Sequence, residues 1–133
     1  MSISVDWYVP NKVLLIKIAG NLALPDMLGL ISQLESYKQT LHEFHQIYDL
    51  TEMVKFLGLT EFKQGLRPDL MTTGYIFAVG SMNPMVKFMS STVIQFTGVR
   101  LKTAPTVEEA INQLQKLDPA LKTPAPADVS SKA

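Results

Sequence analysis

Residues 74–84 read Gly74-Tyr75-Ile76-Phe77-Ala78-Val79-Gly80-Ser81-Met82-Asn83-Pro84, and this stretch decides the fold. The run from Tyr75 to Val79 is apolar without alternation, which is typical of a strand covered on both faces of a parallel sheet. Gly80 ends the run. Asn83 and Pro84 then supply a capping residue and a first-turn proline, so a helix is expected to follow. A strand followed by a capped helix indicates an α/β protein.

A second strand-and-helix unit follows near the end of the chain. Residues 100–104 are expected to form a strand, and Thr106-Val107-Glu108-Glu109 has the pattern of a capping box. The apolar residues that follow recur with the helical period of about 3.6 residues. They are Val107, Ala110, Ile111, Leu114 and Leu117.

The first half of the chain predicts a hairpin, a helix and a strand. Residues 3–8 alternate, residues 13–18 are rich in branched side chains, and the turn chemistry of residues 9–12 lies between them. Gly20 is expected to end the second strand. A helix is expected from Pro25, followed by a strand over residues 46–50 with Asp49 at its carboxyl end. The apolar positions of that helix are Met27, Leu28, Ile31, Leu34 and Leu41.

The two middle helices are predicted from their caps and apolar positions. Thr60 is expected to cap a short helix that carries Leu59, Phe62 and Leu66, and Pro68 limits its length. For the next helix, Gly98 is expected to be the C-cap. The residues expected on its core face are Met85, Phe88, Met89, Val93 and Phe96, while Val86 and Ile94 are surplus apolar residues.

The predicted fold class is α/β, a single-domain sandwich over residues 1–118. Its order is β-β-α-β-α-β-α-β-α, with a five-stranded mixed sheet that is parallel except for the N-terminal hairpin. Residues 119–133 form a segment rich in Pro, Ala and Ser that is expected to be a disordered tail.

The composition excludes several classes of function. Twelve Lys and Arg balance twelve Asp and Glu, so no basic face for nucleic acid is expected. The absence of cysteine excludes thiolate chemistry and a disulfide framework. No run approaches the roughly 20 apolar residues of a membrane-spanning helix, and the N-terminus lacks a signal pattern, so a soluble cytoplasmic protein is expected. Because 47% of residues are hydrophobic, a homodimer or a ligand groove is also expected.

Three segments of residues 3–118 resemble the SpoIIAA-like family of the STAS superfamily, which shares its fold with the Sec14-type (CRAL-TRIO) lipid-binding domains. They are residues 13–20 leading into a helix, residues 75–88, and residues 106–110 before the last helix. The resemblance implies a non-enzymatic regulatory module that binds a protein partner. Signalling members carry an Asp-Ser-Ser/Thr-Gly phosphorylation site at the start of the second helix. This chain has Leu57-Gly58-Leu59-Thr60 there, so the phosphoserine is not carried over. For Thr60, the role of helix cap is favoured over that of phosphoacceptor.

No metal or catalytic set is predicted. His42 and His45 have a spacing that suits one helical face, with Glu43 nearby, but a zinc site needs at least three protein ligands in fixed geometry. Asp49 and Glu52 follow the carboxyl end of a strand, where open α/β sheets bind ligands. A turn capped by Asp49 is favoured over acid–base chemistry, since no nucleophile or base is predictable beside these carboxylates.

Two further segments have a structural and a functional interpretation. The loop from Gly80 to Pro84 offers backbone N–H groups to an anion, but an Asn-capped helix is favoured because no glycine-rich phosphate motif is present. The Met- and Phe-rich helix after Pro84 is interpreted as core packing, with self-association and ligand lining as alternatives.

The function expected from the sequence is a SpoIIAA-like protein-interaction module without the phosphorylatable serine, and the alternative is a carrier or sensor of a small apolar or lipid-like ligand. No cofactor is expected. The candidate residues for binding a partner or a ligand are Asp49, Thr51, Thr60, Gly80, Ser81, Asn83, Met85 and Met89.

Overall fold

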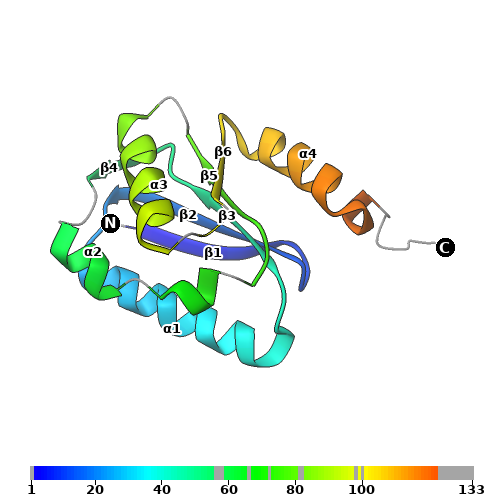
Figure 1. Cartoon of the computed structure of the whole chain (residues 1–133), viewed down its shortest axis with the longest axis horizontal. Helices are drawn as coiled ribbons and strands as arrows, with labels where there is room; N and C mark the ends of the chain where they lie inside the picture. Colours follow the sequence, from blue (N-terminus) through cyan, green and yellow to red (C-terminus); the bar gives the residue numbers. More distant parts are fainter. Residues whose placement is uncertain are drawn as a thin grey trace.

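The computed structural model describes residues 2–55, 59–65, 67–71, 73–80, 83–97, 99 and 101–122. The described elements are strands and α-helices, which are labelled in Figure 1, and two 3-10 helices, η1 and η2. In chain order they are β1 (Ser2–Val9), β2 (Val13–Asn21), α1 (Leu24–Leu41), β3 (His45–Asp49), β4 (Met53–Lys55), α2 (Leu59–Gly65), η1 (Pro68–Met71), β5 (Ile76–Val79), α3 (Pro84–Thr97), β6 (Leu101–Ala104), α4 (Val107–Leu117) and η2 (Pro119–Lys122).

The strands form one mixed sheet, which confirms the predicted fold class. Its order is β1-β2-β3-β5-β6, with β1 antiparallel to β2 and the other pairs parallel. The short strand β4 was not predicted, and it pairs with the end of β2. Gly20 does not end β2, because the strand continues to Asn21. The backbone N–H of Gly20, at a φ of 76°, donates to the carbonyl of Glu52 over 2.9 Å.

Helices cover the two faces of the sheet unequally (Figure 1). On one face, Leu14, Ile16 and Ala78 belong to a core shared with α1, α2 and α3. On the other face, Phe77 and Val79 pack with α4. All four residues of β5 are buried, as its unbroken apolar run predicts.

Helix α3 is rotated relative to the prediction. Val86, expected as surplus, is fully buried, whereas Phe88, expected in the core, is 54% exposed. The buried side of the helix includes Val86, Ser90 and Val93, whose spacings of four and three residues place them together. Val93 is therefore in the core, as predicted. Ile94 is exposed, as expected of a surplus residue. The side chains of Met85 and Phe96, and the expected cap Gly98, lie outside the described residues.

The ends of α2 and α4 differ in how well they were predicted. Thr106 caps α4, since its hydroxyl oxygen accepts a hydrogen bond from the Glu109 backbone N–H over 3.1 Å. Thr60 is not the cap of α2, because the helix already includes Leu59. In the expected tail, Pro119–Lys122 forms η2, and residues 123–133 lie outside the described residues. Within the part of the chain that the structure describes, no helix is long and apolar enough to cross a membrane.

Candidate functional site

The carboxyl ends of β3 and β5 bring together three of the predicted site residues, Asp49, Thr51 and Gly80. The backbone N–H of Leu50 donates to the carbonyl of Val79 over 3.0 Å, so the two strand ends stay in register. Gly80 has a φ of 108° and packs so closely that an added Cβ would lie 3.2 Å from the Thr51 N and Cα atoms. Only glycine adopts this backbone conformation without strain. We call the surface formed by Asp49, Thr51, Glu52 and Asn83, beside the buried Gly80, the carboxyl-edge surface.

The turn after β3 is held by the Asp49 carboxylate. Its Oδ1 atom accepts hydrogen bonds from the Thr51 backbone N–H, over 3.2 Å, and from the Thr51 hydroxyl. Thr51 and Glu52 are exposed, and Glu52 lies 3.8 Å from the Lys17 ammonium group. These contacts fit a carboxylate that caps a turn. They present a shaped polar surface to solvent.

Asn83 joins this turn to the start of α3. It immediately precedes the helix, and its side-chain amide donates to the carbonyl of Met53 in β4 over 3.2 Å. The backbone N–H of Asn83 also donates to the carbonyl of Gly80 over 2.8 Å. Asn83 therefore holds the start of α3 against the start of β4 and against Gly80 after β5, and it belongs to the same surface as the turn.

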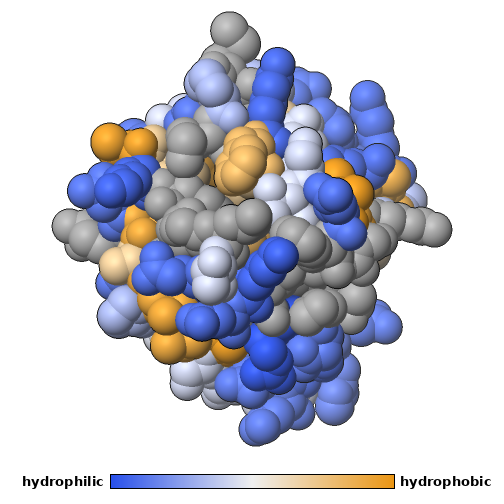
Figure 2. All heavy atoms as spheres, turned by 60° about the vertical axis from the view of Figure 1, so that its left-hand side comes forward, coloured by the Kyte–Doolittle hydropathy of each residue, from blue (hydrophilic) through white to orange (hydrophobic). Residues whose placement is uncertain are grey.

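The remaining predicted residues are placed differently. Thr60 is exposed on α2, which packs against α1. Met89 is partly buried on α3 and faces the core. Ser81 and the side chain of Met85 lie outside the described residues. Figure 2 views the molecule with its α2 and β4 side turned forward, and there apolar groups are interspersed with polar ones.

The two histidines do not share a helical face, although their spacing in the sequence suits one. His42 lies in the turn after α1 with a φ of 67°, whereas His45 begins β3. The His45 Nε2 atom lies 2.8 Å from the Asp118 Oδ2 atom, and its Nδ1 atom accepts a hydrogen bond from the Tyr75 backbone N–H. The hydrogen bond with His45 holds the pKa of Asp118 below its usual value. No cluster of three metal-ligating side chains is found among the described residues.

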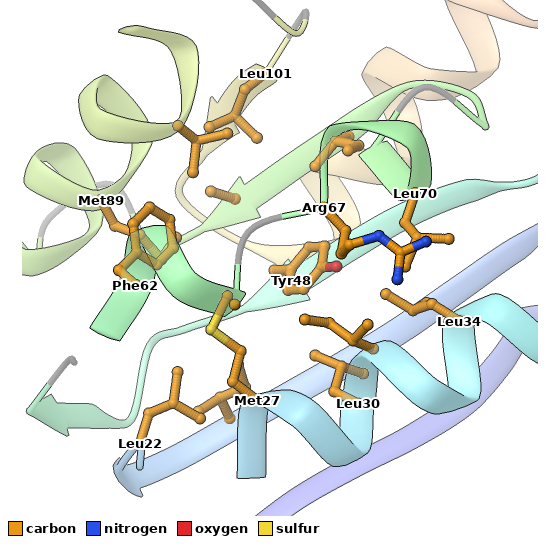
Figure 3. Close-up of a pocket in the computed structure, with 16 residues that line it drawn as sticks. Leu22, Met27, Leu30, Leu34, Tyr48, Phe62, Arg67, Leu70, Met89 and Leu101 are labelled. Atoms are coloured by element: carbon orange, nitrogen blue, oxygen red, sulfur yellow. The ribbon is translucent and has the colours of Figure 1, made fainter. Parts of the chain in front are cut away.

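A second feature is an apolar cavity of about 90 Å³ between the sheet and helices α1, α2 and α3 (Figure 3). Met89 lines it, and most of its wall was not predicted as a site from the sequence. The lining residues are Ile18, Leu22, Met27, Leu30, Ile31, Leu34, Tyr48, Phe62, Gly65, Arg67, Leu70, Ile76, Ala78, Met89, Val93 and Leu101.

The polar groups at this cavity have partners within the protein. The Tyr48 hydroxyl donates to the Gln46 Oε1 atom over 2.7 Å, and burial raises the pKa of Tyr48. The Arg67 guanidinium contacts the carboxylates of Glu35, over 3.0 Å, and Asp69, over 2.9 Å. These hydrogen bonds raise the pKa of Arg67 further above its already high value. The cavity therefore has no unpaired charge among the described side chains.

Three solved structures share this arrangement of strands and helices. The first is the anti-sigma factor antagonist SpoIIAA in its unphosphorylated form, with a TM-score of 0.62 and 15% identity over 86% of this chain and 98% of that chain. The second is an uncharacterised protein of the DUF3478 family with a SpoIIAA-like fold from Shewanella loihica PV-4, with a TM-score of 0.62 and 18% identity over 85% and 92%. This fold is SpoIIAA-like.

The third structure is the Bacillus cell fate determinant SpoIIAA in its phosphorylated form, with a TM-score of 0.55 and 16% identity over 85% of this chain and 99% of that chain. No protein-family model and no curated protein matches the sequence. At these identities the structural likeness shows the SpoIIAA-like fold alone, and the function has to be argued from the surface and the cavity.

Proposed function

We propose that the chain is a non-enzymatic regulatory module that binds a protein partner through the carboxyl-edge surface. The observation that carries this proposal is the exposed turn at Thr51 and Glu52, which Asp49 and Gly80 hold in one shape. A preorganised polar surface favours recognition because little conformational entropy is lost on binding. The likeness to a structure described as an anti-sigma factor antagonist supports the same class of function.

Thr60 and Ser81 belong to the proposal as residues predicted from the sequence, since both carry hydroxyl groups that suit polar recognition. The module works without the phosphorylatable serine motif, so the proposed regulation is by binding alone. It has no cofactor and acts in the cytoplasm.

Two matched charge reversals test the proposal. Glu52→Lys changes the carboxyl-edge surface, and Glu43→Lys makes the same change on an exposed loop residue before β3, at the other end of that strand. Affinity capture from the native host with tagged wild-type protein is expected to enrich a protein that Glu52→Lys loses and Glu43→Lys retains. Equal recovery with both variants would place the interface elsewhere, and recovery of nothing above background would reject the module.

The cavity favours a second candidate function, a carrier or sensor of a small apolar ligand. Its volume of about 90 Å³ is below the roughly 300–1,000 Å³ of most sites for drug-sized ligands, so a whole lipid is too large. Native mass spectrometry of the purified chain tests this function. A retained molecule that adds mass to the protein would support the carrier, and a clean protein mass would reject it.

A homodimer is also part of the proposal. Strand β1 is eight residues long and, among the described strands, pairs only with β2, so its outer edge is free to pair with a second copy. The same native mass spectrum reports the assembly state. A monomer at all protein concentrations would remove the dimer and leave the partner-binding proposal intact.

A further inference from the structure

Strand β1 presents a free edge beside α1 (Figure 1). Among the described strands it pairs only with β2, and an unpaired edge offers a row of backbone N–H and C=O groups to an extended chain. Ile3, Val5 and Trp7 are partly buried and pack against the core shared with α1. Ser4 and Asp6 alternate with them and are exposed. A strand added to this edge would therefore have one row of its own side chains on the α1 side.

The backbone groups that point out of this edge belong to Ile3 and Val5. The first N–H of β3 donates to the carbonyl of Lys12, just before β2, over 2.8 Å, so the even-numbered residues of β2 direct their backbone groups toward β3. The odd-numbered residues direct theirs toward β1. Lys17 is odd-numbered and pairs with Ser4, so the backbone groups of Ser4 point toward β2. Those of Ile3 and Val5 alternate with them and point outward.

A groove of about 390 Å³ lies between β1 and the first half of α1, and we call it the β1–α1 groove. Ile3 and Val5 line it from the strand, and Asp26, Gly29 and Gln33 line it from the helix. Gly29 leaves the groove open, since nothing lies within 4 Å of the position of an added Cβ. A sheet edge with side-chain pockets beside it is the arrangement that recognises extended peptides by strand addition.

The β1–α1 groove carries a negative charge. Asp26 is the one charged side chain among its lining residues, and its Oδ2 atom accepts a hydrogen bond from the Ala23 backbone N–H over 3.2 Å. A Lys or Arg side chain suits this carboxylate, and an apolar side chain suits Val5 and Leu30. A second copy of β1 meets only part of this requirement, because Ser2–Val9 contains no Lys or Arg. The charge therefore favours a segment of another protein.

We propose that the outer edge of β1 and the β1–α1 groove bind an extended peptide segment of a protein partner. The segment adds as a strand beside β1 and carries an apolar residue and a Lys or Arg two positions apart, which places both side chains on the α1 side. Backbone hydrogen bonds to Ile3 and Val5 hold the segment, and the groove selects its side chains. The site shares no residue with the carboxyl-edge surface. The proposed homodimer would use the same edge, and the peptide is expected to displace the second copy.

Selection from a random heptapeptide library displayed on phage, with the full chain as bait, is the first test. We expect enriched peptides in which Lys or Arg lies two positions from an apolar residue, with no proline between them because proline cannot donate to a strand ladder. The absence of enrichment over the bare support would overturn the proposal. Enriched peptides that lack a basic residue would overturn it as well.

A pair of leucine variants locates the selected peptide. Gly29→Leu fills part of the β1–α1 groove and is expected to fold, since the new Cβ meets nothing within 4 Å and leucine favours a helix. Gln39→Leu adds the same side chain at an exposed position of α1, about 15 Å farther along the helix. A synthetic copy of the peptide is expected to bind Gly29→Leu about tenfold or more weakly and Gln39→Leu within about twofold of wild type. Equal affinities would overturn the proposal.

Asp26→Asn tests the charge of the groove. Asparagine keeps a side-chain oxygen that accepts from the Ala23 N–H, so the start of α1 is retained. The basic peptide is expected to bind this variant about two- to fivefold more weakly, and a peptide with Gln in place of its Lys or Arg is expected to bind it as it binds wild type. Equal weakening of both peptides would overturn the proposal. Glu52→Lys should leave peptide binding within about twofold, so failure of this site and failure of the carboxyl-edge surface are distinguishable.

Amide hydrogen exchange followed by NMR tests strand addition itself. With the synthetic peptide bound, the N–H groups of Ile3 and Val5 are expected to exchange about tenfold or more slowly. The N–H of Ser4 is expected to change less, because it already faces β2. Unchanged exchange at Ile3 and Val5 would overturn the proposal. Protection of these two groups in the free protein that the peptide does not increase would assign the edge to a second copy and would also overturn it.

Discussion

The His45 Nε2 atom lies 2.8 Å from the Asp118 Oδ2 atom, although the two residues are 73 positions apart in the chain. The other ring nitrogen of His45 accepts from the Tyr75 backbone N–H, so the neutral ring carries its hydrogen on Nε2 and donates it to Asp118. This arrangement joins the start of β3, the segment before β5 and the end of α4. The contact holds α4 against the face of the sheet that carries Phe77 and Val79.

Replacing His45 tests how much this connection contributes. His45→Ala is expected to lower the free energy of unfolding by about 1–3 kcal/mol, because it leaves the Tyr75 N–H without its acceptor and Asp118 without its donor. Urea unfolding followed by circular dichroism measures the change. A double-mutant cycle with Asp118→Ala is expected to show coupling of about 0.5–1.5 kcal/mol, and additive effects of the two changes would contradict a direct interaction.

The pH dependence of stability tests the lowered pKa of Asp118. The folded pKa lies below the unfolded value of about 3.9, so its stabilisation is present above about pH 4 and is lost as pH falls through the folded pKa. Because the Asp118 side chain is 35% exposed, the effect is expected to be no more than about 1 kcal/mol. The difference in unfolding free energy between wild type and Asp118→Asn should shrink from pH 6 to pH 3. A constant difference would contradict this assignment.

Gly74 is expected to be intolerant of a side chain. An added Cβ would lie 2.7 Å from the His45 Nδ1 atom and 2.7 Å from the Phe44 carbonyl oxygen, which forces the backbone or the imidazole to move. Gly74→Ala should cost about 1–3 kcal/mol of stability. The control is Gly29→Ala, in α1, where nothing lies within 4 Å of the new Cβ and a gain of about 0.5–1 kcal/mol is expected. Equal effects at the two glycines would argue against the close packing at Gly74.

Tyr48→Phe tests the part-buried hydrogen bond between Tyr48 and Gln46. Removing the hydroxyl leaves the Gln46 side-chain oxygen without this donor, with an expected loss of about 1–2 kcal/mol at neutral pH. Because burial raises the pKa of Tyr48, the wild type should lose stability as pH rises above the unfolded value of about 10, where the unfolded chain releases the proton first. Urea unfolding at pH 8 and pH 10.5 measures both effects. An unaltered alkaline slope in Tyr48→Phe would contradict the raised pKa.

The elements that were predicted correctly carry local signals. The unbroken apolar run of β5 and the Thr106 cap of α4 lie within short segments, so a few neighbouring residues determine them. Helix α3 was placed with the wrong rotation because apolar residues surround it, and Val86 and Phe88 are equally plausible core residues by type. Only packing against the sheet decides between them.

The features that the sequence did not reveal depend on long-range packing. Strand β4 has three residues and exists because it pairs with the end of β2. The cavity depends on how three helices meet the sheet, and the partners of Arg67 and His45 come from other elements. The carboxyl-edge surface was partly predictable, since Asp49 and Gly80 end parallel strands and such ends meet at one edge of a sheet.

The most direct test of the central claim is quantitative affinity capture from the native host with wild-type, Glu52→Lys and Glu43→Lys proteins, each first shown to be folded. Binding through the carboxyl-edge surface predicts that one captured protein falls about tenfold or more with Glu52→Lys and stays at the wild-type level with Glu43→Lys. The opposite pattern, with loss at Glu43→Lys and retention at Glu52→Lys, would contradict the account.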